Sequence, residues 1–391
     1  MKKILIVRFS SFGDIVQAMG VVPCLGQTFP DAAIDWVVRS DFAEVVRLEG
    51  RIRRVWSFER HAGFMGLVNI ARLAQLAREI HAEQYDLIYD AHSNLRSTIL
   101  KLLLRGLSIF GPLRALSAKK TTTIITRSKE RWKRLLLFYF RINHFDKPFC
   151  GAKSYLQPLF PMFPVFNFMH AHWDFPQHFE QSNDANIVNI VLVPSAAWPM
   201  KRWPLEHFHQ LLKILGESLA AAAAAAATAC RPSGYRFVII GGPEDSFCEE
   251  LVLRYNQHAR DAQDAQAAQL GDWPAISNLA GKLTLLESCY VVATSCLVVS
   301  ADTGFLHVAD LLGKPGVALI GPTAFGFPSG KSLKVMEADE SAQLKCRPCT
   351  KDGRGKCSHQ IYQFCMVAIT PERVAEQLLS VLDLERKELA G

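Results

Sequence analysis

The sequence predicts an α/β protein built from two Rossmann-like domains, and three observations support this fold class. Short apolar runs, typical of buried parallel strands, alternate with segments of helical periodicity. The alternation stops near residues 158–178, where prolines and aromatic residues follow no clear period, and it restarts at Ile187. With 391 residues, 49% of them hydrophobic, the chain is long enough for two buried cores. We therefore expect an N-terminal domain over residues 1–178 and a C-terminal domain over residues 179–391, facing a central cleft.

The elements expected in each half follow from these patterns. In the N-terminal half the candidate strands are Ile4–Val7, Ile34–Val38, Val55–Phe58, Leu87–Tyr89 and Leu107–Phe110. Helical periodicity fills Phe12–Thr28, Ala43–Leu48, Phe64–Ile80 and Arg96–Leu104. In the C-terminal half the candidate strands are Ile187–Val193, Phe237–Ile240, Val298–Ser300 and Val317–Ile320. The alanine tract Ala220–Ala227 is expected to extend a helix or to form a surface excursion.

The stretch from Ser300 to Ala309 is the most informative part of the chain. A strand ends there at the turn residues Asp302 and Gly304, and a helical pattern follows at once. A helix N-terminus at the carboxyl edge of a sheet points backbone N–H groups at the place where phosphates bind. The hydroxyl of Thr303 and the ring of His307, one turn along, would complete an anion pocket. The alternative is an ordinary capped helix with a buried histidine.

A second unit of this kind occurs at the start of the chain. The run Ile4–Val7 leads into Arg8-Phe9-Ser10-Ser11-Phe12-Gly13-Asp14, after which helical periodicity begins. Asp14 would then lie at the mouth of the sheet, either as a functional carboxylate or as a helix cap. Neither a G-x-G-x-x-G fingerprint nor a P-loop lysine occurs in the chain, so a dinucleotide site and a P-loop site are unsupported.

The net charge of +7 is concentrated in one segment. Residues 91–141 contain 12 Lys and Arg but a single acid, Glu130, and their C-terminal part interleaves basic residues with Trp132, Tyr139 and Phe140. Basic and aromatic residues together suit an anionic membrane surface or an anionic amphiphile. Nucleic acid is a competing partner, and a solvated helix with one core-facing stripe is a third interpretation.

Targeting signals indicate the cellular compartment, and the compartment in turn indicates the chemical state of the cysteines. No apolar run reaches the roughly 18 residues of a spanning helix, and no signal-peptide pattern precedes the first strand, so we expect a cytoplasmic protein. In that compartment ten cysteines are more typical of thiols than of disulfides. Four of them, Cys346, Cys349, Cys357 and Cys365, would form a zinc site, a redox-labile pair or simply packed thiols.

Four segments in order resemble a known family. They are Ile4–Asp14 with Ser-Ser-Phe-Gly-Asp, Pro194–Pro204 with Lys-Arg-Trp-Pro, Gly241–Asp245, and Asp302–His307 followed by Gly-Pro-Thr. Together they are similar, over nearly the whole chain, to glycosyltransferase family 9, the ADP-heptose:lipopolysaccharide heptosyltransferases. The resemblance implies the GT-B fold, with the acceptor on the N-terminal domain and the nucleotide-sugar on the C-terminal domain. It also implies inverting transfer of L-glycero-D-manno-heptose from ADP-heptose to the lipopolysaccharide inner core, without a metal or another cofactor.

The resemblance also implies roles for matched residues on the donor side. Lys201 would neutralise a diphosphate oxygen, while Thr303, Gly304 and His307 would cradle the pyrophosphate. Asp302 would orient that loop or contact the donor sugar. Glu244 or Asp245 would bind the ribose hydroxyls, and Leu283 would pack on adenine. Many members have a hydroxyl residue where this chain has Ala197, so Ser195 or the backbone N–H groups of residues 195–197, Ala196 included, would contact the phosphates.

On the acceptor side the resemblance implies that Asp14 is the general base. Ser10, Ser11, Gly13 and Arg96 are the other acceptor-site candidates, and Arg96 is placed to hold a phosphate or carboxylate of the acceptor. We expect peripheral contact with the anionic inner face of the cytoplasmic membrane and no nucleic acid partner.

Two alternative functions remain at this point. One is a family 9 glycosyltransferase with another nucleotide-sugar or another glycan acceptor. The other, of a different class, is a non-catalytic basic surface protein that binds nucleic acid or lipid. A carboxylate opposed to a phosphate pocket distinguishes them, because a simple binding module has no need of Asp14 together with Lys201 and His307.

Overall fold

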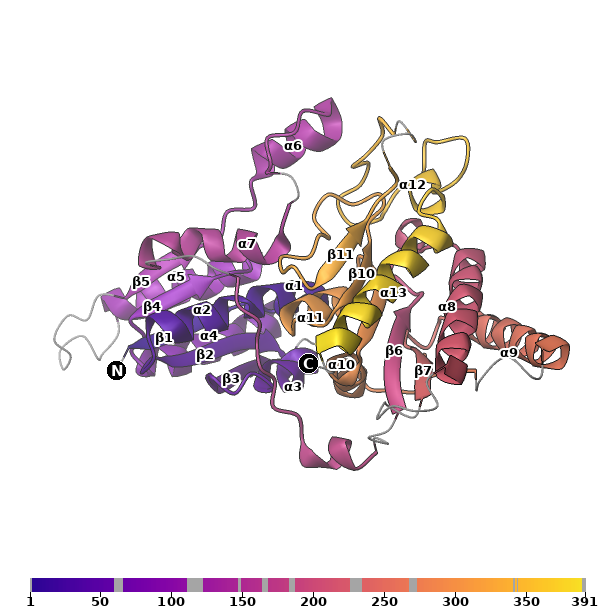
Figure 1. The fold of residues 1–391 in the computed structure, drawn as a ribbon. Helices are drawn as coiled ribbons and strands as arrows, with labels where there is room; N and C mark the ends of the chain where they lie inside the picture. Colours follow the sequence, from indigo (N-terminus) through magenta and orange to yellow (C-terminus); the bar gives the residue numbers. More distant parts are fainter. Residues whose placement is uncertain are drawn as a thin grey trace. The chain divides into compact units, whose positions relative to one another are not determined.

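A computed structural model describes residues 2–59, 66–110, 122–146, 149–163, 168–182, 187–225, 234–266, 273–339, 342 and 344–388. The chain divides into two compact units. Unit 1 comprises Met1–Leu135 and Gly151–Asp174, and unit 2 comprises Leu136–Cys150 and Phe175–Gly391. Each unit contains one parallel sheet with helices packed against it, as Figure 1 shows. The expected fold class, two Rossmann-like α/β units, is confirmed.

The sheet of unit 1 has five strands in the order β3-β2-β1-β4-β5. The strands are β1 (Lys3–Val7), β2 (Ala33–Arg39), β3 (Ile52–Phe58), β4 (Leu87–Asp90) and β5 (Thr123–Thr126). All pairs are parallel, and β1 lies between β2 and β4. The central strands are buried on both faces, which explains their continuous runs of Ile, Leu and Val.

The described part of unit 1 contains six α-helices and the first half of a seventh, α6. They are α1 (Phe12–Met19), α2 (Val21–Thr28), α3 (Ala43–Arg47), α4 (Gly66–Ala82), α5 (Leu95–Phe110), α6 (Arg131–Phe140) and α7 (Gly151–Leu156), with the 3-10 segments η1 (Ser40–Phe42) and η3 (Gln157–Met162). Apolar residues of α4 and α5, among them Leu76 and Leu100, form a buried core with Leu5 and Val7 of β1. Helices α1 and α2 contact α7.

One expected strand is wrong. Leu107–Phe110 is the last turn of α5, and the fifth strand is Thr123–Thr126 instead. Leu100, Leu104 and Leu107 recur at i, i+4 and i+7 and pack against the same core, so the apolar run continues a helical stripe. A short apolar run does not by itself distinguish a strand from a buried helical turn, and here the preceding helix decides the outcome.

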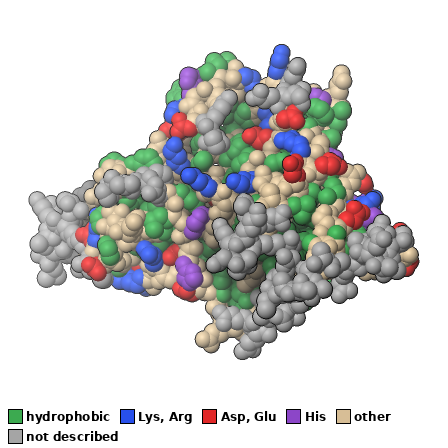
Figure 2. All heavy atoms as spheres, in the orientation of Figure 1, with side chains coloured by type: hydrophobic (Ala, Val, Ile, Leu, Met, Phe, Trp, Pro, Cys, Tyr) green, Lys and Arg blue, Asp and Glu red, His purple; other side chains and the backbone are tan. Residues whose placement is uncertain are grey.

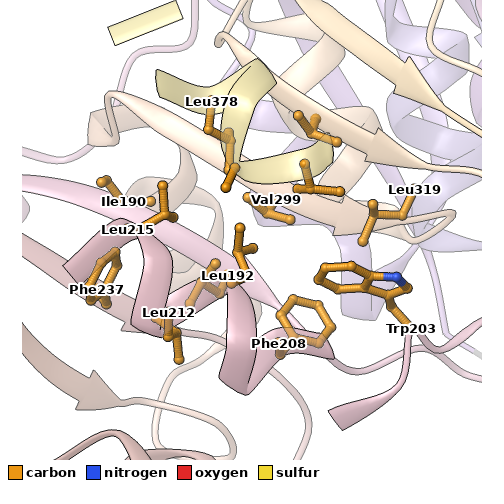
Figure 3. Close-up of a cluster of buried hydrophobic side chains, with 14 of the residues drawn as sticks. Ile190, Leu192, Trp203, Phe208, Leu212, Leu215, Phe237, Val299, Leu319 and Leu378 are labelled. Carbon is orange, nitrogen blue, oxygen red and sulfur yellow. The ribbon is translucent and has the colours of Figure 1, made fainter. Parts of the chain in front are cut away.

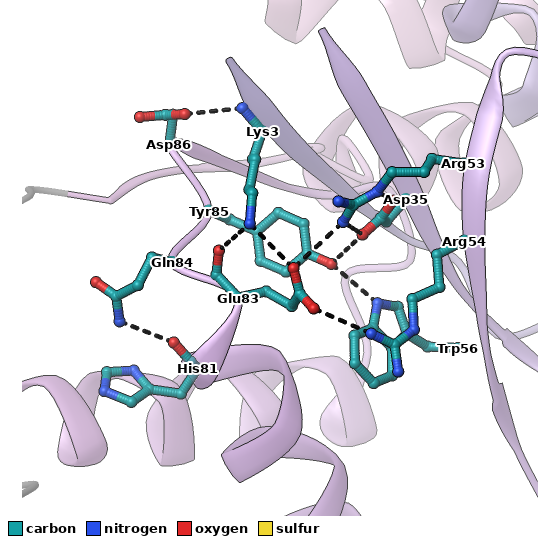
Figure 4. Close-up of polar contacts among 10 residues, drawn as sticks. All are labelled: Lys3, Asp35, Arg53, Arg54, Trp56, His81, Glu83, Gln84, Tyr85 and Asp86. Carbon is teal, nitrogen blue, oxygen red and sulfur yellow. Dashed lines mark hydrogen bonds and ion pairs between the residues drawn. The ribbon is translucent and has the colours of Figure 1, made fainter. Parts of the chain in front are cut away.

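A polar network joins the strands of unit 1 at their amino ends (Figure 4). Asp35, fully buried, receives two hydrogen bonds from Arg53 and one from the hydroxyl of Tyr85, and Trp56 donates to the same hydroxyl at 2.9 Å. Glu83 pairs with Lys3 at 3.0 Å and also with Arg53. A buried carboxylate must be paired to be tolerated, so this network ties β1, β2 and β3 together.

The sheet of unit 2 has six strands in the order β11-β10-β9-β6-β7-β8. They are β6 (Ile187–Val193), β7 (Gly234–Ile239), β8 (Ala275–Asn278), β9 (Leu297–Ala301), β10 (Gly316–Leu319) and β11 (Leu333–Met336), all in parallel pairs. The four expected strands of this half are confirmed. The edge strands β8 and β11 are short and only partly buried, so they lack a strong apolar signal.

The helices of unit 2 complete its core. They are α8 (Leu205–Ala225), α9 (Phe247–Gln266), α10 (Leu285–Thr294), α11 (Gly304–Leu311), α12 (Phe364–Val367) and α13 (Pro371–Glu388), with the 3-10 segments η4 (Gln177–Ser182) and η5 (Pro199–Lys201). Leu212 and Leu215 of α8 and Leu378 of α13 pack on Ile190 and Val299 of the sheet (Figure 3).

Two sequence features can be followed in the described helices, namely the alanine tract and the length of the apolar segments. Ala220–Ala225 extend α8, and the last two alanines lie outside the described residues. Of the helices described, none is both long and apolar enough to cross a membrane.

Candidate active site

The first group of candidate residues lies at the carboxyl edge of the unit 1 sheet. Arg8–Asp14 follow β1, and Ala91–Arg96 follow β4, its neighbour in the sheet. The strand order changes direction between β1 and β4, and ligands of open α/β sheets bind at such a point. The topology therefore brings Asp14, His92 and Arg96 to one place.

Asp14 lies in the first turn of α1 and is held by three donors. Arg8 Nη2 lies 2.6 Å from Oδ2, the Ser11 hydroxyl donates to Oδ2 at 2.7 Å, and the Tyr155 hydroxyl donates to Oδ1 at 3.0 Å. Burial alone would raise the pKa of Asp14, but the Arg8 charge and these hydrogen bonds outweigh it and hold the pKa well below its usual range. Its side chain remains 43% exposed, so the ionised carboxylate is accessible to a ligand.

His92 packs directly beside this turn. The Phe9 backbone N–H donates to His92 Nδ1 at 3.0 Å, so Nδ1 is the acceptor and Nε2 carries the proton of the neutral ring. Burial, reinforced by the charges of Arg8 and Lys129, lowers the pKa of His92 to about 3. His92 is therefore a neutral donor at physiological pH.

The remaining acceptor-site candidates have simpler surroundings. The Arg96 guanidinium lies 5.4 Å from the ring centroids of both Phe9 and Phe58, and the side chain is half-buried at the start of α5. Ser10 and Gly13 are half-buried in the turn that carries Asp14. Arg96 thus stays close to the turn after β1 through Phe9.

The second group of candidates lies at the carboxyl edge of the unit 2 sheet. The strand order there changes direction between β6 and β9. Lys201, in η5, follows β6, while Asp302, Thr303 and His307 follow β9. The switch point of this sheet therefore holds a cation and a helix N-terminus side by side.

Asp302 is the centre of a compact polar network. Lys201 Nζ lies 3.3 Å from Oδ2, the Thr323 hydroxyl donates to Oδ2 at 2.8 Å, and His307 Nε2 lies 3.7 Å from Oδ1. Burial alone would raise the pKa of Asp302, but Lys201, His307 and Thr323 together hold it well below the usual range. Asp302 is ionised and keeps the Lys201 ammonium next to the start of α11.

The loop after β10 closes against this carboxylate. Thr323 reaches it through its hydroxyl, and the α-carbon of Gly326 lies so close that a β-carbon there would collide with the Asp302 carboxylate. Only glycine allows that approach. A cavity of about 560 Å³ lies along the same loop, lined by Thr323, Phe325 and Phe327 among others.

Thr303 is the N-cap of α11. Its hydroxyl accepts the Leu306 N–H at 3.3 Å and shares a hydrogen bond of 2.9 Å with Ser300. Because that hydroxyl already caps the helix, an anion here would be met chiefly by backbone N–H groups at Gly304 and its neighbours.

The loops after β6 and β7 are joined by one buried carboxylate. Asp245 is buried; its Oδ2 accepts the Gly242 N–H at 2.7 Å, and Arg202 Nη2 lies 3.3 Å from Oδ1. Arg202 also donates to the Ala196 carbonyl at 3.1 Å. Asp245 therefore builds the loops, whereas the neighbouring Glu244 is exposed and available to a ligand.

The other expected donor-site residues surround these loops. Ser195 is half-buried, Ala196 is buried and Ala197 is exposed. Leu283 is half-buried and lies just before the N-cap of α10. Its loop meets the β7 loop through a hydrogen bond of 3.1 Å from Gly281 N to the Gly241 carbonyl.

These two sets of residues coincide with a known family. The model of glycosyltransferase family 9 (heptosyltransferase) matches residues 160–356, half of the chain. The chain belongs to glycosyltransferase family 9. It is therefore a glycosyltransferase, and the expected enzyme class is confirmed.

Curated relatives cover almost the whole chain at low identity. Lipopolysaccharide heptosyltransferase 1 of Escherichia coli K12 is 24% identical over 345 residues, which cover 85% of this chain and 92% of that protein. Lipopolysaccharide heptosyltransferase 2 of the same strain is 22% identical over 392 residues, covering 97% and 98%.

Solved structures of the family show the same fold. A family 9 glycosyl transferase from Veillonella parvula has a TM-score of 0.64 at 19% identity and covers 97% of both chains. The E. coli ADP-heptose lps heptosyltransferase II has a TM-score of 0.60 at 19% identity and covers 99% of this chain and 100% of that one. The likeness confirms the GT-B architecture.

The sequence patterns do not identify several residues that the structure places at the candidate site. Tyr155, Arg8 and His92 all lie at the unit 1 edge, yet none was singled out. His92 and Arg8 directly follow strand ends, a signal that would have marked them. Tyr155 is 141 residues from Asp14 in the chain, and no local sequence pattern indicates that it contacts Asp14.

The four C-terminal cysteines are free thiols. Burial raises the pKa of Cys349, and it raises that of Cys365 to about 12, which keeps these thiols protonated. Within the part of the chain that the structure describes, no three His, Cys, Asp or Glu side chains are arranged to hold a metal ion.

Proposed function

We propose that this family 9 glycosyltransferase transfers L-glycero-D-manno-heptose from ADP-heptose to the inner core of lipopolysaccharide, with inversion and without a metal ion. The names of the E. coli relatives, lipopolysaccharide heptosyltransferases 1 and 2, support the acceptor class. A solved E. coli heptosyltransferase bound to ADP, with a TM-score of 0.57 at 19% identity, supports the nucleotide. In this proposal unit 1 binds the acceptor and unit 2 binds the donor.

The order of residues along the unit 2 edge carries the proposal. Thr303 follows β9, Lys201 follows β6, Glu244 follows β7 and Leu283 follows β8, and these four strands are consecutive in the sheet. Neighbouring strands are about 4.8 Å apart, so the row spans roughly 14 Å. A nucleoside diphosphate laid along it would place its phosphates at Lys201 and α11, its ribose at Glu244 and its base against Leu283.

The donor half of the reaction follows from this placement. As the bond between the anomeric carbon and the phosphate oxygen breaks, its electron pair stays on ADP and negative charge grows on the β-phosphate. Lys201 and the N-terminus of α11 lie where that charge appears, and pre-arranged positive groups stabilise it. They supply the compensation that a divalent cation provides in other transferases, which is why the proposed transfer needs none.

The acceptor half places Asp14 as the general base. The acceptor oxygen forms the new bond to the anomeric carbon on the face opposite the leaving phosphate, so the configuration inverts. Its proton passes to the Asp14 carboxylate. The pKa of Asp14 is low, but the acceptor hydroxyl becomes strongly acidic as its oxygen bonds to carbon, and a weak base then suffices. Arg96 is proposed to hold an anionic group of the acceptor.

We also propose that α6 docks on the anionic cytoplasmic face of the membrane. Trp132 is 78% exposed and Tyr139 is 82% exposed, seven residues apart on one helical face, with Leu135 between them. Hydrophobic side chains are visible at the surface over α6 in Figure 2. Arg131 and Lys133 flank them, the combination that interfacial helices use on anionic lipid. Three further cations of the basic segment, Arg114, Lys119 and Lys120, lie outside the described residues.

One experiment tests the proposed function directly. The protein is incubated with ADP-heptose and defined truncated lipopolysaccharides, with and without EDTA, and the products are weighed by mass spectrometry. A mass gain of one heptose, unaffected by EDTA, is expected. Absence of transfer together with calorimetry showing no ADP binding at millimolar concentration would reject the donor class. Loss of transfer in EDTA would reject only the metal-free step.

A further inference from the structure

The Asp14 carboxylate does not present its two oxygens equally. Oδ2 pairs with the Arg8 guanidinium and accepts a hydrogen bond from the Ser11 hydroxyl, whereas Oδ1 accepts a hydrogen bond from the Tyr155 hydroxyl. A carboxylate offers about four lone-pair sites, two on each oxygen. The contacts described for Asp14 fill both sites of Oδ2 and one site of Oδ1.

Tyr155 is itself held firmly. It is fully buried in α7, its ring lies 3.8 Å from the Arg127 guanidinium and 5.6 Å from that of Arg8, and its backbone carbonyl accepts the Tyr89 hydroxyl. Arg127 in turn donates to Ser154, the preceding residue of α7. The hydroxyl therefore reaches Asp14 from a fixed ring rather than from a mobile side chain.

We propose that Tyr155 is a positioning residue for the general base: its hydroxyl fixes the plane of the Asp14 carboxylate, so that the open site of Oδ1 receives the acceptor's proton. The inference rests on the proposed function, since it assigns a role relative to that base. Burial raises the pKa of Tyr155 to about 12, so the phenol remains a donor throughout the range in which the enzyme would be assayed.

Removing the hydroxyl has two expected consequences. Without this donor the carboxylate is less firmly oriented, and it is less stabilised as an anion, so the pKa of Asp14 rises. Tyr155→Phe keeps the ring between the two guanidinium groups. We expect kcat to fall roughly 5- to 10-fold, the scale of one hydrogen bond. We expect KM for ADP-heptose and the affinity for ADP to stay unchanged, because the hydroxyl acts only on the proposed base.

Unit 1 contains a matched control. Tyr85 is also buried and also donates its hydroxyl to an arginine-paired carboxylate, Asp35, but at the amino ends of the strands (Figure 4). Tyr85→Phe removes an equivalent hydrogen bond far from Asp14. It should lower the melting temperature while leaving kcat per folded molecule and KM as in the unchanged protein.

The measurement compares kcat, KM for ADP-heptose, ADP affinity and melting temperature in the unchanged protein and both variants. A fall in kcat at unchanged KM and unchanged ADP affinity in Tyr155→Phe alone supports the proposal. Equal behaviour of the two variants, or a Tyr155→Phe effect confined to melting temperature, overturns it. If the unchanged protein neither transfers heptose nor binds ADP, it is the proposed function that fails.

Discussion

The Lys201 ammonium lies 3.3 Å from the Asp302 carboxylate at the switch point of the unit 2 sheet. Both side chains are largely buried, so the pair is a fixed feature and not a surface contact. A diphosphate bound at the start of α11 would share this ammonium with Asp302, and the carboxylate would keep Lys201 aimed at the phosphates.

The first prediction concerns this lysine. Lys201→Ala should weaken ADP binding by about 1.5–3 kcal/mol, the range for hydrogen bonds to charged groups. Calorimetry with ADP measures the change. Lys334→Ala, on the exposed face of the edge strand β11, removes the same charge and should leave the affinity unaltered. Unchanged ADP affinity in Lys201→Ala would place the phosphate site elsewhere.

The second prediction concerns Asp14. Asp14→Asn retains a hydrogen-bonding side chain of the same size but cannot take a proton, so turnover should fall roughly 10²–10⁴-fold while ADP affinity is kept. Steady-state kinetics and calorimetry test both halves. Asp31→Asn, an exposed carboxylate of the same unit, is the control. Near-normal turnover in Asp14→Asn would show that Asp14 is only a residue of the first turn of α1 and not the general base.

The third prediction separates two adjacent carboxylates. Glu244→Ala should raise the dissociation constant of ADP about tenfold, through loss of a charged hydrogen-bond acceptor, without changing the melting temperature. Asp245→Ala should instead lower the free energy of unfolding by about 1–3 kcal/mol, because it leaves Arg202 and the Gly242 N–H without this partner. If Glu244→Ala destabilises the fold and leaves ADP binding intact, the assignment of the ribose contact is wrong.

The limits of sequence-based inference are clearest at these same positions. Strand ends and helix starts are local patterns, and they predicted the turn with Asp14 and the turn with Asp302–His307 at the edges where the structure has them. No local pattern shows which of the adjacent carboxylates Glu244 and Asp245 is engaged within the loops, because the partner of Asp245, Arg202, is 43 residues away in the chain. The sequence predicts a strand at the helical end of α5 because its three apolar residues, Leu107, Ile109 and Phe110, fit either period.

The fourth prediction uses the neutral histidine of unit 1. An unfolded histidine has a pKa near 6.5, and His92 in the fold has a pKa of about 3. Between these values the unfolded state binds a proton that the folded state does not, so stability falls as the pH drops from 6.5 towards 3. At pH 5 this linkage amounts to about 2 kcal/mol.

His92→Asn keeps an acceptor for the Phe9 N–H and removes the titrating ring. Urea unfolding at pH 8 and pH 5 should then show a smaller loss of stability at pH 5 than in the unchanged protein. His172→Asn, at a histidine whose side chain is 94% exposed, serves as the control. An identical pH dependence in His92→Asn and the unchanged protein would show that the ring is protonated in the fold.

The last prediction concerns α6. Trp132 and Tyr139 present apolar surface to solvent on one helical face, and burying aromatic surface in lipid is favourable by roughly 1.5–3 kcal/mol for each side chain. The double variant Trp132→Ala/Tyr139→Ala should therefore weaken binding to vesicles containing phosphatidylglycerol by tenfold or more, as measured by sedimentation. Tyr362→Ala, at another exposed tyrosine, should not.

The charges of α6 give this prediction a second, independent readout. Reversal of Arg131 and Lys133 to Glu removes attraction worth about 1 kcal/mol per charge near an anionic surface, and added salt should reduce the difference from the unchanged protein. Arg134 is unsuitable for this purpose because its Nε atom is buried, so its reversal would disturb the fold. Since the aromatic contribution is not screened by salt, the two sets of variants should respond differently to ionic strength. Vesicle binding that is indifferent to both sets would exclude α6 as the membrane contact.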